Sequence, residues 1–271
     1  MPAPIAVILA RGLGTRMRRA DSSAGLGEAQ SRVADTGVKA MIPIGRPFLD
    51  FVLSGLADAG ITEVCLVIGP EHDAVRDYYE RTIRLERVTV SFAVQAHPRG
   101  TADAVAAAGE VVGRRPFLVL NSDNYYPPEA FRALAALDGP GVVVFGRDAM
   151  IHDGNVPPER IAQFAIVRIA ADGSLEDIIE KPDAATLAAC GDDVFVSMNC
   201  WRLDASVLDA CRRVAPSARG ELELPDAVRL AQREAGTVFR VVTLRSGVLD
   251  LSSRADIAAV AERLSGIEVR L

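Results

Sequence analysis

The sequence predicts an α/β fold, in which an open, mainly parallel, twisted sheet carries helices on both faces. Short apolar runs typical of strands alternate with amphipathic stretches typical of helices through the first half of the chain. The first apolar run, 5–10, contains no polar residue, as expected of a strand that is buried on both faces. A loop with two glycines follows it directly, and ligands bind such sheets at the carboxyl ends of the strands.

Later elements of the first half follow the same alternation. Pro47 begins an amphipathic helix that is expected to end near Gly60. The other predicted strands of this half lie at 63–68, 88–94, 117–120 and 142–145, and the predicted helices at 71–80, 101–112 and 127–137.

The second half mixes hairpins with helices. Two strands, 164–169 and 175–180, are expected to pair as a hairpin around the turn at Asp172 and Gly173. Further strands are predicted at 194–201 and 238–244, and helices at 205–214, 221–235 and 253–264. The sequence shows no internal repeat, and in particular no hexapeptide repeat of a β-helix.

Composition sets the class of protein. The 271 residues, 49% hydrophobic and 24% charged, are ordinary for one globular domain spanning 1–271. The net charge of −6 argues against a nucleic-acid partner. We expect no signal peptide and no membrane span, because no apolar run approaches the roughly 18 residues that a span needs. Four scattered cysteines predict free thiols and a cytoplasmic location, and the three histidines lack metal-ligand spacing.

The glycine loop reads from Arg11 to Arg16 as Arg-Gly-Leu-Gly-Thr-Arg, with a further cation at Arg18. Glycines admit close approach of the backbone to an anion, and guanidinium groups bind phosphate, so the loop predicts a triphosphate cradle. An ordinary tight turn remains open from the glycines alone, but a turn has no use for clustered positive charge. Met17 stands where a dinucleotide-binding loop needs its third glycine, which excludes a dehydrogenase.

A second polar segment follows the third strand. Gln95 lies at a strand end, where its amide could read the edge of a nucleobase or could simply cap the strand. Gly100 would let a flat ring approach, and Thr101 is the expected N-cap of the next helix.

Two aspartates end apolar runs far apart in the sequence. Asp123 follows 117–120, and Asp250 lies in the short apolar run 248–251. A buried carboxylate needs a cation, which could be an arginine or a shared Mg²⁺. The residues alone leave these alternatives open; Mg²⁺ as the cofactor, with both aspartates as its ligands, is what the family resemblance described below implies.

Five motifs together resemble the sugar-phosphate nucleotidyltransferases, also called nucleoside-diphosphate-sugar pyrophosphorylases. The motifs are Leu-Ala-x-Gly-x-Gly-Thr-Arg-Met at 9–17 with the lysine at 39, Gln-x4-Gly-Thr-Ala-Asp-Ala at 95–104, the aspartates at 123 and 250, Glu-Lys-Pro at 180–182, and Ser-Met-Asn at 197–199. The resemblance runs from about residue 5 to 260 and implies a Rossmann-like, glycosyltransferase-A-like nucleotidyltransferase fold. It also implies a nucleotide-binding half, about 1–145, and a sugar-phosphate-binding half, about 146–271.

The resemblance assigns roles by position. Arg16, Lys39 and Lys181 would be catalytic, with the first two on the leaving pyrophosphate and the third on the attacking phosphate. The nucleotide-binding residues would be Ala10, Gly12, Gly14, Thr15, Gln95, Gly100 and Thr101. Glu180 and Asn199 would bind the sugar phosphate, and Asp123 and Asp250 would bind the metal.

Four departures from the family pattern are visible. Arg11 stands where the family usually has a small residue, and Arg18-Arg19-Ala20 replaces the usual Pro-Leu-Thr. Ser122 and Ala165 each replace a common glycine, and the latter leaves the identity of the sugar open. The acids of 221–227 also follow a family pattern, but we interpret them mainly as charges at a helix start.

The implied reaction transfers a nucleoside monophosphate from an NTP to a sugar-1-phosphate and releases pyrophosphate. UTP or dTTP is the expected nucleotide, although the motif does not fix the base, and a homo-oligomer stays open. Two alternatives remain: transfer to a non-sugar phosphate such as an alcohol or amino-alcohol phosphate, and a non-catalytic nucleotide-sugar sensor. Finally, 20–36 has little apolar periodicity and is expected to be a mobile lid that becomes ordered on substrate.

Overall fold

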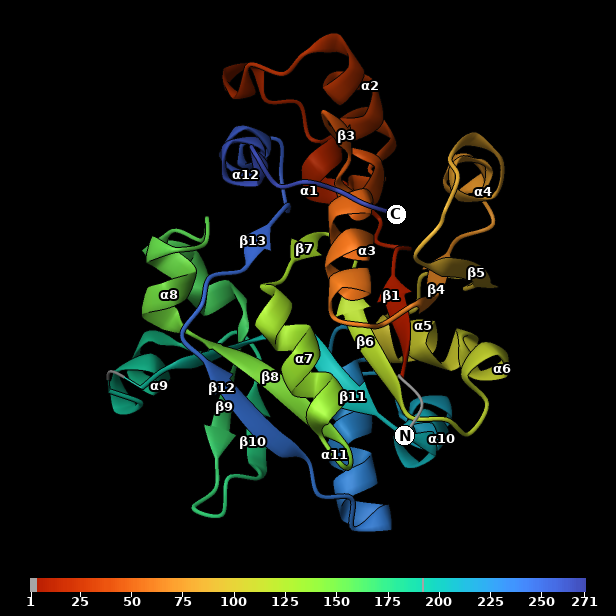
Figure 1. Cartoon of the computed structure of the whole chain (residues 1–271). Helices are drawn as coiled ribbons and strands as arrows, with labels where there is room; N and C mark the ends of the chain where they lie inside the picture. Colours follow the sequence, from red (N-terminus) through yellow and green to blue (C-terminus); the bar gives the residue numbers. More distant parts are fainter. Residues whose placement is uncertain (1–3, 192) are drawn as a thin grey trace.

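The computed structural model describes residues 4–191 and 193–271. Within them, nine strands form one sheet, in which seven follow the order β10-β9-β11-β6-β1-β4-β5 and β8 and β12 extend it beside β11 (Figure 1). The strands are β1 (Ile5–Leu9), β2 (Pro43–Ile44), β3 (Arg46–Pro47), β4 (Glu63–Ile68), β5 (Thr89–Val94), β6 (Phe117–Asn121), β7 (Asn124–Tyr125), β8 (Gly141–Gly146), β9 (Ala165–Ile169), β10 (Leu175–Ile179), β11 (Phe195–Leu203), β12 (Arg240–Leu244) and β13 (Leu249–Asp250).

The helices alternate with these strands. They are α1 (Thr15–Arg18), α2 (Glu28–Thr36), α3 (Phe48–Asp58), α4 (Asp73–Asp77), α5 (Thr101–Ala107), α6 (Gly109–Val112), α7 (Pro128–Ala136), α8 (Arg147–His152), α9 (Ala184–Ala189), α10 (Ala205–Arg213), α11 (Leu224–Ala235) and α12 (Asp256–Leu264). Short 3-10 turns lie at Ser22–Ala24, Lys39–Met41 and Pro158–Gln163, and a π turn at Tyr78–Thr82 extends α4.

The two halves of the sheet differ in direction. β5, β4, β1 and β6 are parallel neighbours, with Ala6 opposite Val64 and Leu118. β11 then runs antiparallel to β6, β8 and β9, and the hairpin of β9 and β10 closes this side. The predicted hairpin is therefore confirmed, and parallel pairing dominates only the first half, where βα units connect the strands.

Two apolar cores cover the two faces of the sheet. Alternate residues of β1 point in opposite directions, so Ala6 and Ile8 join the core beneath α3 and α7, while Ile5 and Val7 join the core beneath α5, α10 and α11. Each face is thus a helical layer packed on a sheet, and the predicted α/β class with helices on both faces is confirmed.

Several predicted elements are shorter or are interrupted. The helix predicted over 101–112 is two helices, α5 and α6, and the helix predicted over 71–80 turns from α into π geometry at Tyr78. The helix predicted from 221 begins only at Leu224, because Pro225 is tolerated in the first turn and not further inside. Helices α8 and α9 had no prediction.

The segment 20–36 corrects one expectation. It holds a 3-10 turn and the nine-residue helix α2, which ends on Gly37 in the left-handed conformation (φ 77°). The helix buries Ala34 and packs the neighbouring Val33 against the larger of the two cores. A narrow apolar edge therefore anchors it, although its sequence lacks a regular amphipathic pattern. The segment therefore contains a turn and a helix where the sequence indicated little regular structure, and its mobility and ordering on nucleotide binding stay predictions.

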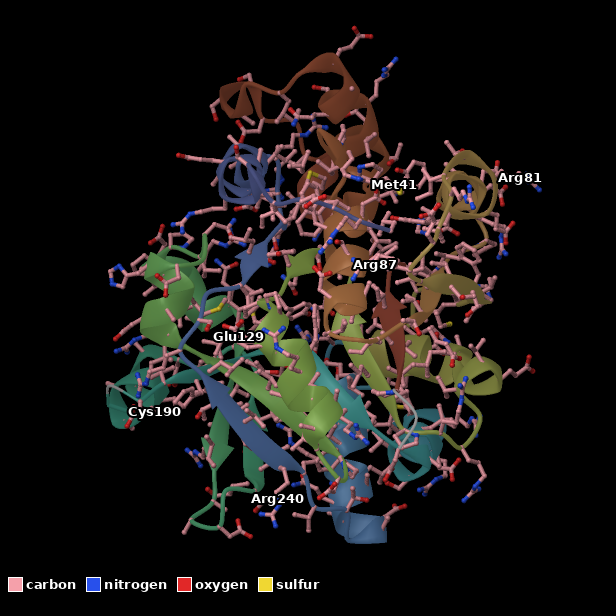
Figure 2. The ribbon with its side chains drawn as sticks, in the orientation of Figure 1. Met41, Arg81, Arg87, Glu129, Cys190 and Arg240 are labelled. Atoms are coloured by element: carbon pink, nitrogen blue, oxygen red, sulfur yellow. The ribbon has the colours of Figure 1, made fainter. Side chains whose placement is uncertain are left out.

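Surface charge is mostly compensated locally. Arg81 and Arg240 project at the periphery of the molecule, where the first meets Asp77 at 2.5 Å and the second donates to the carbonyl of Asp172 at 3.0 Å (Figure 2). The four cysteines are free, as predicted. In the part of the chain that the structure describes, we find no helix long and apolar enough to cross a bilayer.

Candidate active site

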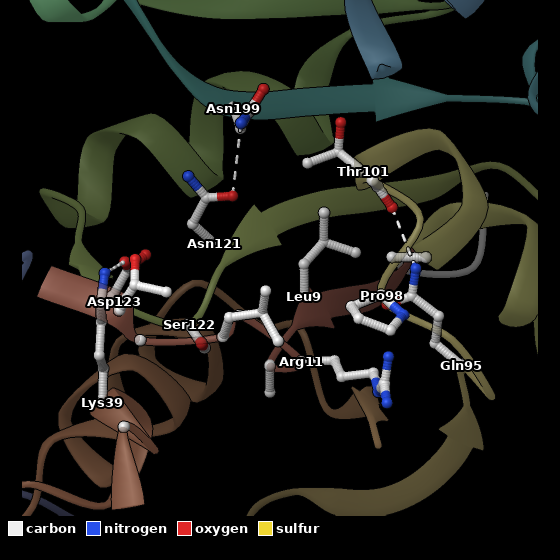
Figure 3. A pocket seen from close by; sticks show the side chains of 18 of the residues that line it. Leu9, Arg11, Lys39, Gln95, Pro98, Thr101, Asn121, Ser122, Asp123 and Asn199 are labelled. Carbon is white, nitrogen blue, oxygen red and sulfur yellow. Dashed lines mark hydrogen bonds and ion pairs between the residues drawn. The ribbon is translucent and has the colours of Figure 1, made fainter. Parts of the chain in front are cut away.

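A cavity of about 460 Å³ opens at the carboxyl ends of β1 and β6. Figure 3 shows Lys39 and Asp123 at one end of it, and Gln95, Pro98 and Arg11 at the other. Its lining contains every residue that we predicted to bind nucleotide, together with both predicted triphosphate cations: Ala10, Gly12, Gly14, Thr15, Arg16, Lys39, Gln95, Gly100 and Thr101. These residues come from three separate segments, 10–16, 39 and 95–101, which lie together at one edge of the sheet.

The glycine loop is shaped by a contact between two glycines. Gly14 has φ 60°, and a Cβ on it would lie 2.1 Å from the carbonyl oxygen of Gly37. Only glycine allows this approach. The approach holds the loop against the chain that leads into Lys39. Gly12 differs, because a Cβ there would meet nothing within 4 Å among the described residues. The protein itself does not demand glycine at this position, so the space beside Gly12 is available to a ligand.

The arginines of the loop do not act as one cluster. Arg16 lines the cavity, but Arg18 donates to the carbonyl of Thr36 at 3.0 and 2.7 Å and so ties the loop to the end of α2. Arg11 turns toward Glu71. The three cations therefore do not form one cluster, and the binding of a triphosphate by this loop stays a prediction.

Gln95 is held in one orientation. Its Nε2 donates to the carbonyl of Gly100 at 3.1 Å and to the Asp103 carboxylate at 2.8 Å, while Arg99 donates to the other oxygen of Asp103 at 2.6 Å. Gly100 has φ 123°, and a Cβ there would lie 2.4 Å from the backbone oxygen of Leu222.

Thr101 is not the N-cap that we expected. It is the first residue of α5, and its Oγ1 instead accepts from the backbone N–H of Leu224 at 2.8 Å, at the start of α11. The same loop brings Glu221 into the lining of the cavity, although we interpreted that acid as a helix-start charge.

Lys39 and Asp123 form an ion pair at 2.8 Å, with side chains 18% and 23% exposed. Burial alone would lower the pKa of Lys39, but the charge and hydrogen bond of Asp123, helped by Asp250, raise that pKa above its ordinary value. The lysine therefore stays protonated through the neutral range and offers a fixed positive charge beside the cavity.

A second cavity, of about 220 Å³, adjoins the first. The two share Asn121, Asp123 and Asn199 in their linings. The second is otherwise polar and includes Glu180, Ser197 and Asp250 with Ala165. Two ligand-sized spaces that share a wall of amides and one carboxylate suit two substrates that must meet.

Long-range pairing brings Asp250 to Asp123. The two-residue strands β7 and β13 pair antiparallel with Asp250 opposite Asn124, and the N–H of Leu251 donates to the carbonyl of Asp123 at 2.8 Å. Asn124 also donates to Asp250 Oδ1 at 2.9 Å. The convergence that the apolar runs suggested is thus confirmed in position.

Asp250 is also paired with an arginine. Arg160, from the 3-10 turn Pro158–Gln163, bonds Asp250 Oδ2 and reaches Asp256 at 2.7 Å. Burial, followed by the charge of Asp123, raises the pKa of Asp250. No motif or pattern singled out Arg160 from the sequence. It supplies the salt bridge that we weighed as the alternative to a metal.

Two of the predicted site residues have an unusual backbone conformation. In the described part of the chain only Lys181 (φ 45°) and Asn199 (φ 54°) have a positive φ without being glycine. The pairing of β11 with β8 shifts between Ser197 and Cys200, so Asn199 lies in a bulge. Its amide donates to Asn121 at 3.4 Å and accepts from the Trp201 indole at 3.3 Å.

Glu180 and Lys181, which follow the end of β10, lie in different places relative to the cavities. Glu180 lies in the lining of the second cavity, whereas Lys181 is exposed and belongs to neither lining. Glu180 is itself exposed at the mouth of this cavity, but partial desolvation of its carboxyl by neighbouring groups, followed by the charge of Glu223, raises its pKa. The structure therefore does not bring Lys181 together with the other predicted catalytic residues.

Asn121, one of the two asparagines that line both cavities, was not predicted from the sequence, whereas Asn199 was. Asn121 ends β6, and Tyr126 accepts from its backbone N–H at 3.1 Å and donates to the carbonyl of Met198 at 2.7 Å. A polar residue at the end of a buried strand was the available signal. Its link to Asn199 depends on the bulge, which sequence does not reveal.

Comparison with known proteins agrees with this geometry. The sequence profile of the family described as nucleotidyl transferase matches residues 5–246. The chain belongs to this family. The resemblance inferred from the five motifs is thereby confirmed.

Several relatives indicate the range of the family. A low-salt glycan biosynthesis nucleotidyltransferase, Agl11 of Haloferax volcanii, is 28% identical over 213 residues, which cover 76% of this chain and 55% of that protein. The bifunctional protein GlmU of Methanococcus vannielii is 25% identical over 83% of this chain and 46% of its own length. The UTP–glucose-1-phosphate uridylyltransferase YngB of Bacillus subtilis is 25% identical over 83% of this chain and 77% of its own length. The chain thus spans about half the length of the first two relatives.

Solved structures share the fold. A UDP-glucose pyrophosphorylase complexed with UDP-glucose superposes with a TM-score of 0.74 at 17% identity, covering 98% of this chain and 100% of the other. A UTP-bound UGPase from Acinetobacter baumannii gives a TM-score of 0.72 at 19% identity, covering 98% of this chain and 95% of the other. The predicted nucleotidyltransferase fold is therefore confirmed.

Proposed function

We propose that this nucleotidyl transferase moves a nucleoside monophosphate from an NTP to a sugar-1-phosphate. The observation that carries the proposal is the pair of adjoining cavities that share Asn121, Asp123 and Asn199. The larger cavity would hold the NTP, and the smaller one the sugar phosphate. The named activities of YngB and of the UDP-glucose pyrophosphorylases support the same assignment.

The reaction needs no protein nucleophile. An oxygen of the sugar phosphate attacks the α-phosphorus of the NTP, and the bond between this phosphorus and the oxygen bridging to the β-phosphate breaks as pyrophosphate leaves. Catalysis then consists of positioning the two phosphates and neutralising charge. Arg16 and Lys39 line the larger cavity and would stabilise the leaving pyrophosphate. Glu180 and Asn199 would bind the sugar phosphate, and Lys181 would have to turn inward to orient the attacking oxygen.

The residues present fit a divalent cation at the wall between the cavities. Asp123 and Asp250 both line the smaller cavity, and the charge of one raises the pKa of the other, a conflict that a cation resolves. No group of three or more His, Cys, Asp or Glu suited to a metal occurs among residues 4–191 and 193–271. This agrees with Mg²⁺, which commonly takes one or two carboxylates and completes its shell with phosphate and water. When bound there, Mg²⁺ would neutralise charge on the α-phosphate.

The remaining parts of the proposal follow from the substrates. NTP is a cytoplasmic metabolite, so a cytoplasmic location belongs to the proposal, with nucleotide binding by about 1–145 and sugar-phosphate binding by about 146–271. A sensor would not need the ion-paired Lys39 beside the cavity. Transfer to an alcohol phosphate is less favoured, because Glu180 and Asn199 offer hydrogen-bonding groups that suit sugar hydroxyls.

Pyrophosphate release tests the proposal. The purified chain is incubated with Mg²⁺ and each combination of five NTPs (UTP, dTTP, GTP, CTP, ATP) with several sugar-1-phosphates, phosphocholine and phosphoethanolamine. We expect release that depends on both an NTP and a sugar-1-phosphate and is lost in Lys39→Met. Release with phosphocholine or phosphoethanolamine, but with no sugar-1-phosphate, would indicate the non-sugar reaction. Nucleotide binding without release with any acceptor would indicate a sensor.

A further inference from the structure

Arg11 is buried with part of its guanidinium unused. Its side chain is only 7% exposed, and its Nη2 donates to both oxygens of Glu71 at 3.2 Å. Nε and Nη1 are buried and have no hydrogen-bond partner among the described residues. A buried donor without a partner is costly, and this side chain lines the larger cavity. The unused donors therefore suit an acceptor on a ligand.

The place of Arg11 in the cavity distinguishes a base from a phosphate. Figure 3 shows its guanidinium beside Pro98 and Gln95, at the end opposite Lys39 and Asp123. Glu71 holds the same guanidinium, and its carboxylate would repel a phosphate brought to this point. An uncharged acceptor is the better match.

Gln95 supplies the complementary group. Its Nε2 is already used by two acceptors, Gly100 O and Asp103 Oδ2, so the amide cannot turn without placing Oε1 against a carboxylate. Among the described residues, no donor bonds Gln95 Oε1. The base end of the cavity thus has one acceptor, on Gln95, and lies beside two unpaired Arg11 donors that are closed to solvent without a ligand and would have to turn toward a bound base to be used.

We propose that Arg11 determines the base specificity of this enzyme by donating to a carbonyl of the nucleobase while Gln95 Oε1 accepts from the neighbouring ring N–H. This inference rests on the proposed function. Uracil, thymine and guanine carry a carbonyl next to a ring N–H. Cytosine presents an unprotonated ring nitrogen beside its carbonyl, and adenine has no carbonyl. The chain therefore selects UTP, dTTP or GTP over CTP and ATP.

The experiment compares base ranking in the native chain, Arg11→Ala and Arg11→Met, where methionine retains part of the apolar stem. Arg76→Ala is the matched control, because Arg76 is a cation on nearby α4 that packs over Phe92 and lines neither cavity. Dissociation constants for the five NTPs are measured by competition, and kcat and KM by pyrophosphate release. Thermal unfolding of each variant reports on folding.

The native chain and Arg76→Ala should prefer a base that carries a carbonyl next to a ring N–H. In both Arg11 variants the ratio of dissociation constants between the disfavoured and the preferred NTPs should fall by roughly 5- to 150-fold, the contribution of a good side-chain–base pair. The change should appear in KM and not in kcat. A thio analogue of the preferred nucleotide (2-thio-UTP and 4-thio-UTP, or 6-thio-GTP) should bind the native chain more weakly than the parent and bind the Arg11 variants equally well.

Three results would overturn the inference: native preference for CTP or ATP, an unchanged ranking or a uniform loss for all five NTPs in the Arg11 variants, or equal binding of the parent and both thio forms by the native chain. The last measurement needs no variant, so it decides the question even if Arg11→Ala and Arg11→Met do not fold. Absence of pyrophosphate release with every acceptor would contradict the proposed function while leaving the base ranking measurable by binding.

Discussion

The two cavities are built in different ways. The larger one is formed by short loops that follow parallel strands, and its shape depends on glycines at fixed positions, such as Gly14 and Gly100. The smaller one is formed where β11 bulges and where the paired strands β7 and β13 bring residues together across 126 positions, from Asn124 to Asp250. The larger cavity is thus formed mainly by loops that follow neighbouring strands at one edge of the sheet. The smaller cavity depends on contacts between segments that are distant in the sequence.

This difference predicts different sensitivities. Changes in the larger cavity should act through backbone geometry, because glycine allows what a Cβ would block. Changes in the smaller cavity should act through charge and hydrogen bonds, because its buried carboxylates depend on Lys39 and Arg160 as counterions. The experiments below test that contrast.

Loss of charge at the shared wall should have the largest effect. Asp123→Asn and Asp250→Asn should each lower kcat by about 10²- to 10³-fold, the usual cost of removing one preorganised electrostatic contact. The measurement is pyrophosphate release over a range of Mg²⁺ concentrations, with partial rescue at high Mg²⁺ if affinity for the metal is what suffers.

Asp256→Asn is the matched control for these variants. Asp256 also pairs with Arg160, at 2.7 Å, but lines neither cavity. It should lose stability and keep its turnover. Normal turnover of both Asp123→Asn and Asp250→Asn at low Mg²⁺ would contradict the two-aspartate site.

A pair of glycines tests the geometric side of the contrast. Gly14→Ala should destabilise the fold by about 1–3 kcal/mol, because the new Cβ would lie 2.1 Å from Gly37 O and φ is 60°. Gly12→Ala should unfold like the native chain, since nothing lies within 4 Å of its Cβ, yet should weaken NTP binding. Urea unfolding and nucleotide titration measure the two effects, and equal stability losses at both positions would remove the distinction.

The same contrast explains how far the sequence could be interpreted. The order of most strands and helices, the glycine loop and the position of Gln95 at a strand end depend on local patterns, and these were predictable from residues near one another. The bulge at Asn199, the counterion Arg160 and the outward direction of Lys181 were not, because each depends on which distant segment packs beside it. Thr101 shows the limit within a correct motif: its hydroxyl serves α11, a helix more than 120 residues away, instead of its own.

A moderate effect is expected at the bulge. Asn199→Gly should preserve or slightly raise stability, because glycine relieves the positive φ of 54°, but it removes the amide that faces both cavities. Loss of a hydrogen bond worth about 0.5–1.5 kcal/mol predicts a KM for sugar-1-phosphate roughly 2- to 13-fold higher, with less change in KM for the NTP. Equal changes in the two constants would show that Asn199 acts through the fold and not through the sugar phosphate.

The smallest effect should come from Glu180. Partial desolvation, followed by the charge of Glu223, raises the pKa of its carboxyl above the ordinary 4.5, so ionised Glu180 weakly opposes folding. A carboxyl of this kind favours the folded state below its unfolded pKa, and that contribution is lost as the pH rises through the folded value. Glu180→Gln should therefore be slightly more stable than the native chain at pH 7, and this gain should disappear as the pH falls below 4.5. Glu176→Gln, on the strand β10 that leads into Glu180, is the control. If Glu180 binds the sugar, the stabilised variant will also show a higher KM for sugar-1-phosphate, so that stability and function move in opposite directions at one side chain. A stability difference between Glu180→Gln and the native chain that does not vary with pH would refute this account.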